Sequence, residues 1–357
     1  MPTKVIQIGK VKIGGKNPVA IQSMCNTKTQ NVEATVKQIR SLATAGCEIV
    51  RIAIPDMEAA EAVKEIRKQT LGIPLVADIH FDYRLALLAV ENGVDKIRIN
   101  PGNLGGEDKL REVVLACKKR GIPIRVGVNA GSLEKNLKSK TIAAQLAESA
   151  VKNVKAIEKL GYRNLVVSAK ASDVKTSVEA YRILAKKIAY PLHLGITEAG
   201  SEKLGIMKSA AGIGSLLLDG IGNTIRISLT AQPEVEVKAA RDLLRVLGLR
   251  KDGIEVISCP TCGRTEVDLI PLVAQVEEAV EGIKKNLTVA VMGCMVNGPG
   301  EASHADFALV GGKKMFALYT KGKLVKTIPE KEALREFVKL IEQAGVSSLS
   351  KTFGIVS

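Results

Sequence analysis

Aromatic residues are scarce in this chain of 357 residues: they make up 3% of it, and Trp is absent. Proteins that bind single-stranded nucleic acid stack bases on aromatic side chains placed among basic ones. The scarcity therefore argues against this class, although the formal net charge of +15 would favour it. A nucleic-acid-binding or RNA-modifying protein stays an alternative at this point. A membrane protein is not expected, because no uninterrupted apolar run is long enough to cross a bilayer.

Other familiar signals are also missing. Residues 1–8 contain no apolar segment of the signal-peptide kind, and the six cysteines are spread unevenly, so we expect a protein of the reducing cytoplasm without a disulfide framework. No Gly-x-Gly-x-x-Gly motif follows an apolar strand, which argues against a built-in nicotinamide or flavin cofactor. Any electrons that the protein uses must then come from outside.

What the sequence has in quantity is Ile, Val, Leu and Ala, within an apolar content of 46%. This composition is typical of parallel sheets covered by helices. In the first 250 residues, eight short apolar segments are each followed by a helical pattern that ends near a Gly. Eight such alternations predict an α/β fold of the (β/α)8 TIM-barrel type. The expected strands are 19–23, 49–53, 75–79, 96–100, 124–128, 165–169, 192–196 and 224–229.

A linker at 247–253 separates this barrel, residues 1–250, from a second domain, residues 251–357. In the second domain, strands in hairpin order are flanked by two helices, and we expect a small α+β fold with a mostly antiparallel sheet. Residues 5–13 should form a hairpin that closes the barrel floor, and residues 347–357 a loose tail.

Positive charge is concentrated in the barrel, since the part from Lys251 onward holds 13 Lys/Arg and 13 Asp/Glu. Four expected strands carry an Arg between two branched apolar residues: Arg51, Arg98, Arg125 and Arg226. If the apolar neighbours pack outward against helices, each guanidinium points into the barrel. Uncompensated buried charge is costly, so the arrangement predicts a polyanionic ligand such as a phosphate ester. Pairing of individual Arg residues with nearby carboxylates is the alternative.

Polar residues also collect where the expected strands end, which is where barrel enzymes carry their chemistry. Lys170 stands where some barrel enzymes form a Schiff base, although no substrate carbonyl is implied. His80 is an acid or a hydrogen-bonded strand-end residue, and Glu198 is a catalytic carboxylate or the partner of a strand Arg. His193 has apolar neighbours and is expected to be structural.

Three cysteines lie close together in the second domain, in Cys259-Pro260-Thr261-Cys262 and in Gly293-Cys294. A closed zinc site normally needs four protein ligands, so three thiolates indicate an iron-sulfur cluster, for which Glu301, seven residues after Cys294, is the candidate oxygen ligand. A zinc-holding, non-redox lyase stays open as the rival. Cys25 at the barrel mouth is a less favoured fourth thiolate, and Cys47 and Cys117 are expected in the core.

The chain resembles the 4-hydroxy-3-methylbut-2-enyl diphosphate synthase family, in its bacterial two-domain form, of the methylerythritol phosphate route to isoprenoids. The resemblance rests on Cys-Pro-Thr-Cys-Gly-Arg-Thr at 259–265, Gly-Cys-Met-Val-Asn-Gly-Pro-Gly-Glu-Ala at 293–302 and barrel segments such as Val-Ala-Asp-Ile-His-Phe-Asp at 76–82. It implies that a [4Fe-4S] cluster is held by Cys259, Cys262, Cys294 and Glu301. It implies that the substrate is held by Arg51, Arg98, Asn100, Arg125, Asn129, Lys170, His193, Arg226 and Ser228.

The activity implied by the resemblance is the reductive ring opening of 2-C-methyl-D-erythritol 2,4-cyclodiphosphate. Glu198 would face the carbon skeleton, and Glu198 or His80 would supply a proton. Flavodoxin or ferredoxin would be the electron donor, and neither nucleic acid nor a membrane is an expected partner. A seven-residue linker spans about 25 Å at most, too little for the cluster domain to reach its own barrel mouth, so we expect a head-to-tail homodimer, as the resemblance also implies.

Overall fold

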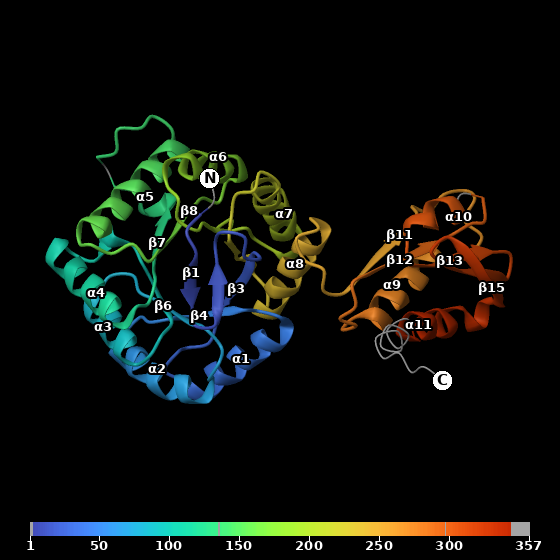
Figure 1. Cartoon of the computed structure of the whole chain (residues 1–357), viewed down its shortest axis with the longest axis horizontal. Coiled ribbons are helices and arrows are strands. Elements are labelled where there is room, and N and C mark those ends of the chain that lie inside the picture. Colours follow the sequence, from blue (N-terminus) through green and yellow to red (C-terminus); the bar gives the residue numbers. More distant parts are fainter. Residues whose placement is uncertain (1–2, 135, 297, 344–357) are drawn as a thin grey trace, which may run out of the picture. The chain divides into compact units, whose positions relative to one another are not determined.

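The computed structural model describes residues 3–134, 136–296 and 298–343. The chain divides into two compact units, Met1–Arg250 and Lys251–Ser357. In the first unit, parallel strands form a central ring that helices surround (Figure 1). The strands are β3 (Ala20–Met24), β4 (Ile49–Ala53), β5 (Leu75–Asp78), β6 (Lys96–Ile99), β7 (Ile124–Asn129), β8 (Leu165–Lys170), β9 (His193–Leu194) and β10 (Thr224–Ile225).

The ring is closed, as the alternation of strands and helices predicted. The hydrogen-bonded order is β8-β7-β6-β5-β4-β3-β10-β9, and a parallel bridge between Val167 and Leu192 joins the two ends. The (β/α)8 barrel is therefore confirmed. The surrounding helices are α1 (Val32–Ala45), α2 (Met57–Gln69), α3 (Tyr83–Glu91), α4 (Glu107–Arg120), α5 (Ile142–Lys159), α6 (Val174–Lys187), α7 (Glu202–Leu218) and α8 (Pro233–Val246).

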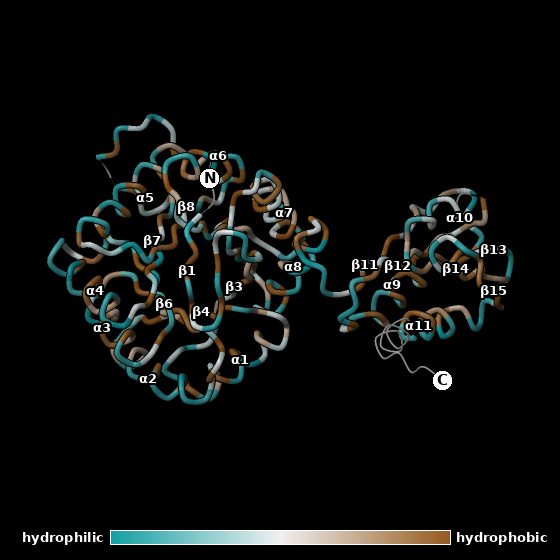
Figure 2. Tube along the Cα trace, viewed as in Figure 1, coloured by the Kyte–Doolittle hydropathy of each residue, from teal (hydrophilic) through white to brown (hydrophobic). Residues whose placement is uncertain are grey.

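Each barrel helix buries one face against the strands, and Figure 2 shows apolar and polar residues alternating along these helices. In α1 the buried positions include Val36, Ile39 and Leu42, at the three- and four-residue spacing of one helical face. The Asn31 side chain accepts a hydrogen bond from the backbone N–H of Ala34 and so caps the helix start. The loops between the strands and these capped helix starts form the carboxyl end of the barrel, where the site lies.

A hairpin of β1 (Ile6–Ile8) and β2 (Val11–Ile13) lies at the amino ends of the barrel strands. Its buried side chains form an apolar cluster with Ile49, Val76 and Val166. The predicted hairpin at the barrel floor is thus confirmed, and it closes the end of the barrel opposite the strand ends that carry polar residues.

Strands seven and eight are shorter than predicted: β9 and β10 replace the expected 192–196 and 224–229. Beyond β9 the backbone stays beside the end of β8, where the N–H of Thr197 donates to the carbonyl of Ala171 over 3.1 Å. Beyond β10 the N–H of Leu229 donates to a side-chain oxygen of Glu236 over 2.9 Å instead of to a neighbouring strand.

The second unit has a five-stranded sheet in the order β11-β12-β13-β14-β15, covered on one face by two helices. Its elements are β11 (Ile254–Ser258), α9 (Leu269–Val280), β12 (Leu287–Met292), α10 (Gly298–Glu301), β13 (Phe307–Gly312), β14 (Met315–Thr320), β15 (Lys323–Pro329) and α11 (Ala333–Gln343).

The α+β class of this unit is confirmed, but the prediction of a mostly antiparallel sheet is wrong. β11 pairs with β12, and β12 with β13, in parallel, and only β13-β14-β15 is antiparallel. The reason is α9, which returns the chain to the start of the sheet between β11 and β12 as a crossover helix does. The expected tail at 347–357 lies outside the described residues. No helix within the described ranges has the length and apolar character needed to cross a membrane.

Candidate active site

The four strand arginines point into the barrel, as their apolar neighbours predicted. Arg51, Arg98 and Arg125 lie in β4, β6 and β7, and Arg226 follows β10 directly. They border a cavity of about 310 Å³ at the carboxyl ends of the strands. Of the eleven barrel residues predicted for the site, nine line this cavity: Arg51, His80, Arg98, Arg125, Asn129, Lys170, Glu198, Arg226 and Ser228.

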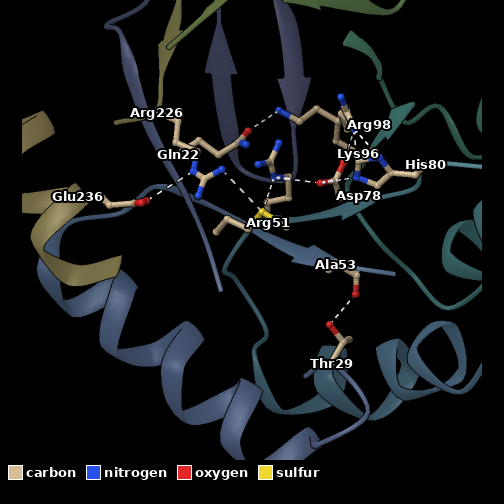
Figure 3. Close-up of polar contacts among 11 residues, drawn as sticks. Gln22, Thr29, Arg51, Ala53, Asp78, His80, Lys96, Arg98, Arg226 and Glu236 are labelled. Carbon is tan, nitrogen blue, oxygen red and sulfur yellow. Dashed lines mark hydrogen bonds and ion pairs between the residues drawn. The ribbon is translucent and has the colours of Figure 1, made fainter. Parts of the chain in front are cut away.

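Asp78 is the carboxylate on which two of the arginines converge (Figure 3). Its oxygens lie 3.2 Å from a terminal nitrogen of Arg98 and 3.7 Å from Nε of Arg51. Burial works to raise the pKa of Asp78, but the charge of Arg51, a hydrogen bond from His80 and the charge of Arg98 hold that pKa well below its usual range. Asp78 is therefore ionised and neutralises part of the cationic cluster.

Arg226 has a partner that the sequence did not indicate. Nε of Arg226 lies 3.5 Å from Glu236, a residue in the first turn of α8 whose exposure is 5% (Figure 3). The same carboxylate accepts hydrogen bonds from the Ser23 hydroxyl at 3.1 Å and from the Leu229 N–H at 2.9 Å. Glu198, which the sequence offered as the partner of a strand arginine, forms no ion pair with Arg226 in the described part of the chain. Glu236 thus fixes Arg226 from the helix layer.

Arg125 and Lys170 have no such carboxylate. Among the described residues, neither side chain makes a hydrogen bond or ion pair, and Nε of the 1%-exposed Arg125 has no partner. Burial, followed by the charges of other arginines, lowers the pKa of Lys170 well below its ordinary value. The same two causes lower the pKa of Arg125, which Asp78 only partly offsets. The cavity therefore holds more positive charge than the protein neutralises.

A further buried cation lies beneath this cavity and was missed. Lys96 has no exposed surface, and its amine donates to the side-chain oxygen of Gln22 over 3.0 Å. Its position two residues before Arg98 on β6 was the available signal, because side chains two apart share a strand face. Burial lowers the pKa of Lys96 well below its ordinary value, and the charges of Arg125 and Arg51 lower it further.

His80 and Glu198 lie at the cavity rim, and both are exposed. His80 Nε2 is 3.5 Å from Asp78 and 3.3 Å from a terminal nitrogen of Arg98. Glu198 has a backbone φ of 53°, in the left-handed region that residues other than Gly rarely adopt. Strain of this kind is common at functional positions. Both groups are placed to exchange protons with a ligand in the cavity.

Asn100 and His193, the two other predicted residues, do not line the cavity. The Asn100 side chain accepts from the N–H of Gly102 over 3.3 Å and so shapes the turn after β6. His193 is fully buried, with Nδ1 2.8 Å from the Thr224 hydroxyl, and its Nε2 has no partner among the described residues. Burial and the charge of Arg125 lower the pKa of His193 well below its ordinary value, so it is neutral.

In the second unit, Cys259 and Cys294 follow β11 and β12, which are adjacent parallel strands. The N–H of Gly293 donates to Sγ of Cys259 over 3.2 Å, which places that sulfur beside the residue preceding Cys294. Cys262 is exposed, and its N–H donates to the Thr265 hydroxyl over 3.2 Å. Two of the three predicted thiol ligands thus lie at the carboxyl ends of two adjacent strands.

The donor set fits an iron-sulfur cluster better than a closed zinc site. Three thiols in two neighbouring loops, with the exposed Glu301 at the end of α10, supply three soft ligands and one oxygen. In the described part of the chain, however, no three side chains of His, Cys, Asp or Glu already form a metal cage. Binding such a group would require the two loops to move closer together.

The other three cysteines belong to the barrel interior. Cys25, Cys47 and Cys117 are buried, and burial raises the pKa of each thiol to about 12. None is in a disulfide. A raised pKa disfavours the thiolate form, which agrees with the expectation that these three are packing residues.

A closed (β/α)8 barrel with a cationic cavity at the carboxyl ends of its strands is typical of a barrel enzyme that binds a phosphorylated anion. Comparison with known proteins gives the family. Residues 3–241 match the GcpE TIM-barrel domain, and residues 255–343 match the GcpE protein C-terminal domain. The chain belongs to the GcpE family, the 4-hydroxy-3-methylbut-2-en-1-yl diphosphate synthases.

Curated relatives agree with this assignment over nearly the full length. A protein of Caldanaerobacter subterraneus named 4-hydroxy-3-methylbut-2-en-1-yl diphosphate synthase (flavodoxin) is 55% identical over 96% of this chain and 97% of its own length. A protein of Anoxybacillus flavithermus with the same name is 51% identical over 98% of this chain and 96% of its own length.

Among solved structures, the barrel is similar to dihydropteroate synthase from Thermus thermophilus. The TM-score is 0.52 at 14% identity, and the match covers 69% of this chain and 98% of that one. At this identity the similarity supports the barrel fold and says nothing of the reaction.

Proposed function

We propose that the chain catalyses the reaction for which its relatives are named, the reductive ring opening of 2-C-methyl-D-erythritol 2,4-cyclodiphosphate to 4-hydroxy-3-methylbut-2-enyl diphosphate. Two electrons and a proton enter, a C–O bond to phosphate breaks, and a hydroxyl group leaves as water. The observation that carries this proposal is the enclosed excess of positive charge at Arg125 and Lys170, which no carboxylate of the described residues pairs. A diphosphate supplies the missing negative charge.

The barrel would bind and orient the diphosphate. Arg51, Arg98, Arg125, Arg226 and Lys170 surround the cavity, and guanidinium groups bind phosphate oxygens through paired hydrogen bonds. When the C–O bond breaks, negative charge develops on the departing phosphate oxygen, and these fixed cations stabilise it without reorganisation. Asn129 and Ser228 add hydrogen-bonding groups on the cavity wall. Asn100 and His193 would act on the substrate only through the turn and the barrel wall that they hold.

Proton delivery would fall to Glu198 or His80. Both lie at the cavity rim, and His80 is already connected to Asp78 and Arg98. The scheme contains no Schiff base at Lys170, because this residue serves as a cation that binds the diphosphate. Measuring the pH dependence of kcat for Glu198→Gln and His80→Asn would separate the two: the variant of the true donor loses turnover throughout, and the other keeps the wild-type profile.

Cys259, Cys262, Cys294 and Glu301 would hold a [4Fe-4S] cluster. When bound, the cluster supplies single electrons and an iron that accepts an oxygen ligand. Flavodoxin, which appears in the relatives' names, would be the electron donor, with ferredoxin as the second candidate. Neither nucleic acid nor a membrane is a partner in this scheme, and the chain is expected to act in the cytoplasm.

We propose a head-to-tail homodimer, which the short linker supports. The side chain of Arg250 donates to the carbonyl of Val19 over 3.2 Å and also contacts Glu48, at the amino ends of β3 and β4. This contact anchors the chain at the barrel floor, and three residues, 251–253, separate it from β11. Three extended residues span about 10 Å, much less than the length of a barrel. The cluster domain would therefore serve the barrel mouth of a second copy.

Mixing two inactive variants tests this arrangement. Lys170→Ala disables the barrel and Cys262→Ser disables the cluster, so each protein alone should be inactive. In a head-to-tail dimer, one of the two sites in each mixed dimer combines an intact barrel with an intact cluster, and activity should return to about a quarter of the wild-type value. No recovery after verified subunit exchange, or a fully active monomer in sedimentation, would overturn the dimer.

The rival reading is a non-redox lyase whose cysteines hold zinc. Anaerobically purified protein should be brown with broad absorption near about 400 nm that is lost in air. It should also convert the cyclodiphosphate when reduced flavodoxin is supplied. Zinc in place of iron and sulfide, with conversion that does not depend on a reductant, would favour the rival.

A further inference from the structure

Two glycines stand at inward positions of the barrel where the neighbouring strands place cations. On β7 the side chains of Arg125 and Asn129 both line the cavity, and Gly127 lies between them on the same face. After β9, Gly195 lies between His193 and the cavity-lining Thr197. Both glycines are buried, and neither has a backbone φ in the left-handed region. Backbone conformation therefore does not explain their presence.

The space beside Gly127 is filled by Arg98 from the adjacent strand β6. A Cβ atom added to Gly127 would lie 2.6 Å from Nε and 3.3 Å from Cζ of Arg98. Arg98 has little room to retreat, because its guanidinium is buried and lies 3.2 Å from Asp78 and 3.3 Å from His80. A methyl group at position 127 would thus push Arg98 away from the carboxylate that holds it.

The space beside Gly195 is filled in the same way by Lys170 from the adjacent strand β8. A Cβ atom there would lie 2.4 Å from the amine nitrogen of Lys170 and 2.7 Å from the backbone carbonyl oxygen of Arg226. Lys170 and Arg226 both line the cavity. One added methyl group would therefore displace the amine of Lys170 and also collide with the backbone carbonyl of Arg226.

We propose that Gly127 and Gly195 are positioning residues, whose missing side chains provide the space from which Arg98 and Lys170 present their charges to the diphosphate. Side chains from neighbouring barrel strands interleave in layers, so an empty position on one strand admits a long side chain from the next. The two glycines thus set how deeply the phosphates enter. This inference rests on the proposed function, since it takes the cavity to be the diphosphate site.

A double-mutant cycle at Gly127 tests the proposal with the cluster-containing enzyme. Calorimetric binding of the cyclodiphosphate would be compared among wild type, Gly127→Ala, Arg98→Ala and the double variant. Gly127→Ala should weaken binding on the order of tenfold to a hundredfold, as expected for a displaced charged hydrogen-bond donor. In the double variant the alanine meets no guanidinium, so binding should match Arg98→Ala within about twofold. Independent, additive losses would overturn the proposal.

Gly214→Ala in α7 is the matched control. Gly214 is also buried, but the nearest atom to an added Cβ is Leu243 Cδ1 at 3.7 Å, an ordinary contact. This variant should bind and turn over substrate as wild type does. If Gly127→Ala fails to fold, the double variant should regain a cooperative thermal transition, because it removes the collision. Failure of both to fold would contradict the assignment of the collision to Arg98.

The crystal structure of ligand-free Gly127→Ala separates this proposal from the proposed function. Arg98 should have left Asp78, whose contact is 3.2 Å in the wild type. Inorganic pyrophosphate serves as a second probe of anion binding. If wild type binds neither the cyclodiphosphate nor pyrophosphate, the proposed function fails whatever the glycines do. If wild type binds and Gly127→Ala binds equally, with Arg98 in place, the positioning role fails alone.

Discussion

Replacing Arg125 by Met should stabilise the ligand-free protein and weaken substrate binding. Arg125 is 1% exposed, its Nε has no partner among the described residues, and the nearby Arg51 and Arg98 repel it. A buried charge without its own counter-charge destabilises the folded state. Met preserves much of the side-chain volume and removes the charge. The folded apoprotein should then gain roughly 1–4 kcal/mol, the range seen when buried ionic groups give way to apolar ones.

The loss in binding should be as large as the gain in stability. A buried charged contact to a phosphate, once truncated, costs about 2–5 kcal/mol, which is about 30-fold or more in the dissociation constant. The two effects have one cause, since the charge that destabilises the empty cavity is the charge that the substrate needs. Strong positive charge in the empty site is thus a consequence of function.

Arg226→Met is the control for this argument. Arg226 is paired with Glu236, so its removal leaves a buried carboxylate without its ion-pair partner, although the hydrogen bonds from Ser23 and Leu229 remain. This variant should lose roughly 1–3 kcal/mol of stability while it also loses substrate affinity. Urea unfolding of the barrel and calorimetric binding of the cyclodiphosphate, measured on both variants, give the comparison. Destabilisation by Arg125→Met, or unchanged affinity, would refute the reasoning.

Three further predictions concern single groups. Asp78→Asn should lower the free energy of unfolding at pH 7 by roughly 3–5 kcal/mol; because the folded pKa of Asp78 is depressed, the difference from wild type should shrink as the pH falls below about 4. The double variant Gln22→Leu, Lys96→Met should be more stable than wild type at pH 7 by roughly 1–4 kcal/mol. Since the pKa of folded Lys96 lies below its ordinary 10.5, the unfolded chain binds the extra proton, and this gain should shrink toward pH 10.5; a pH-independent gain would contradict it. Glu301→Ala should lower iron and sulfide content and turnover together, with cyclodiphosphate binding by the barrel retained; unchanged iron and turnover would exclude Glu301 as a ligand.

Much of the barrel and its mouth could be predicted because strand periodicity carries the information. In Val50-Arg51-Ile52 and its three counterparts, two apolar neighbours fix the direction of the arginine, and all four line the cavity. The same periodicity places Lys96 on the strand face of Arg98, so the sequence could also have predicted that Lys96 points into the barrel. The alternative that individual arginines pair with nearby carboxylates holds for Arg51 and Arg98, which both contact Asp78.

The features that the sequence did not predict depend on contacts between elements that are distant along the chain. Glu236 lies in a helix between Val235 and Val237, and only the packing of α8 on the barrel reveals that it meets Arg226. The ends of β9 and β10 depend on contacts between separate segments, such as the hydrogen bond from the Leu229 N–H to the Glu236 side chain. The parallel pairing of β11 with β12 depended on the length and direction of α9, which strand patterns alone leave open.

The most direct test joins composition and turnover in one anaerobic sample. Iron, sulfide and zinc would be quantified in the purified protein, and the same preparation given the cyclodiphosphate with reduced flavodoxin. The expected result is iron and sulfide in equal amounts, little zinc, and formation of 4-hydroxy-3-methylbut-2-enyl diphosphate that stops when the reductant is withheld. Zinc without sulfide, or a preparation rich in iron and sulfide that binds the cyclodiphosphate and leaves it unreduced, would contradict the account.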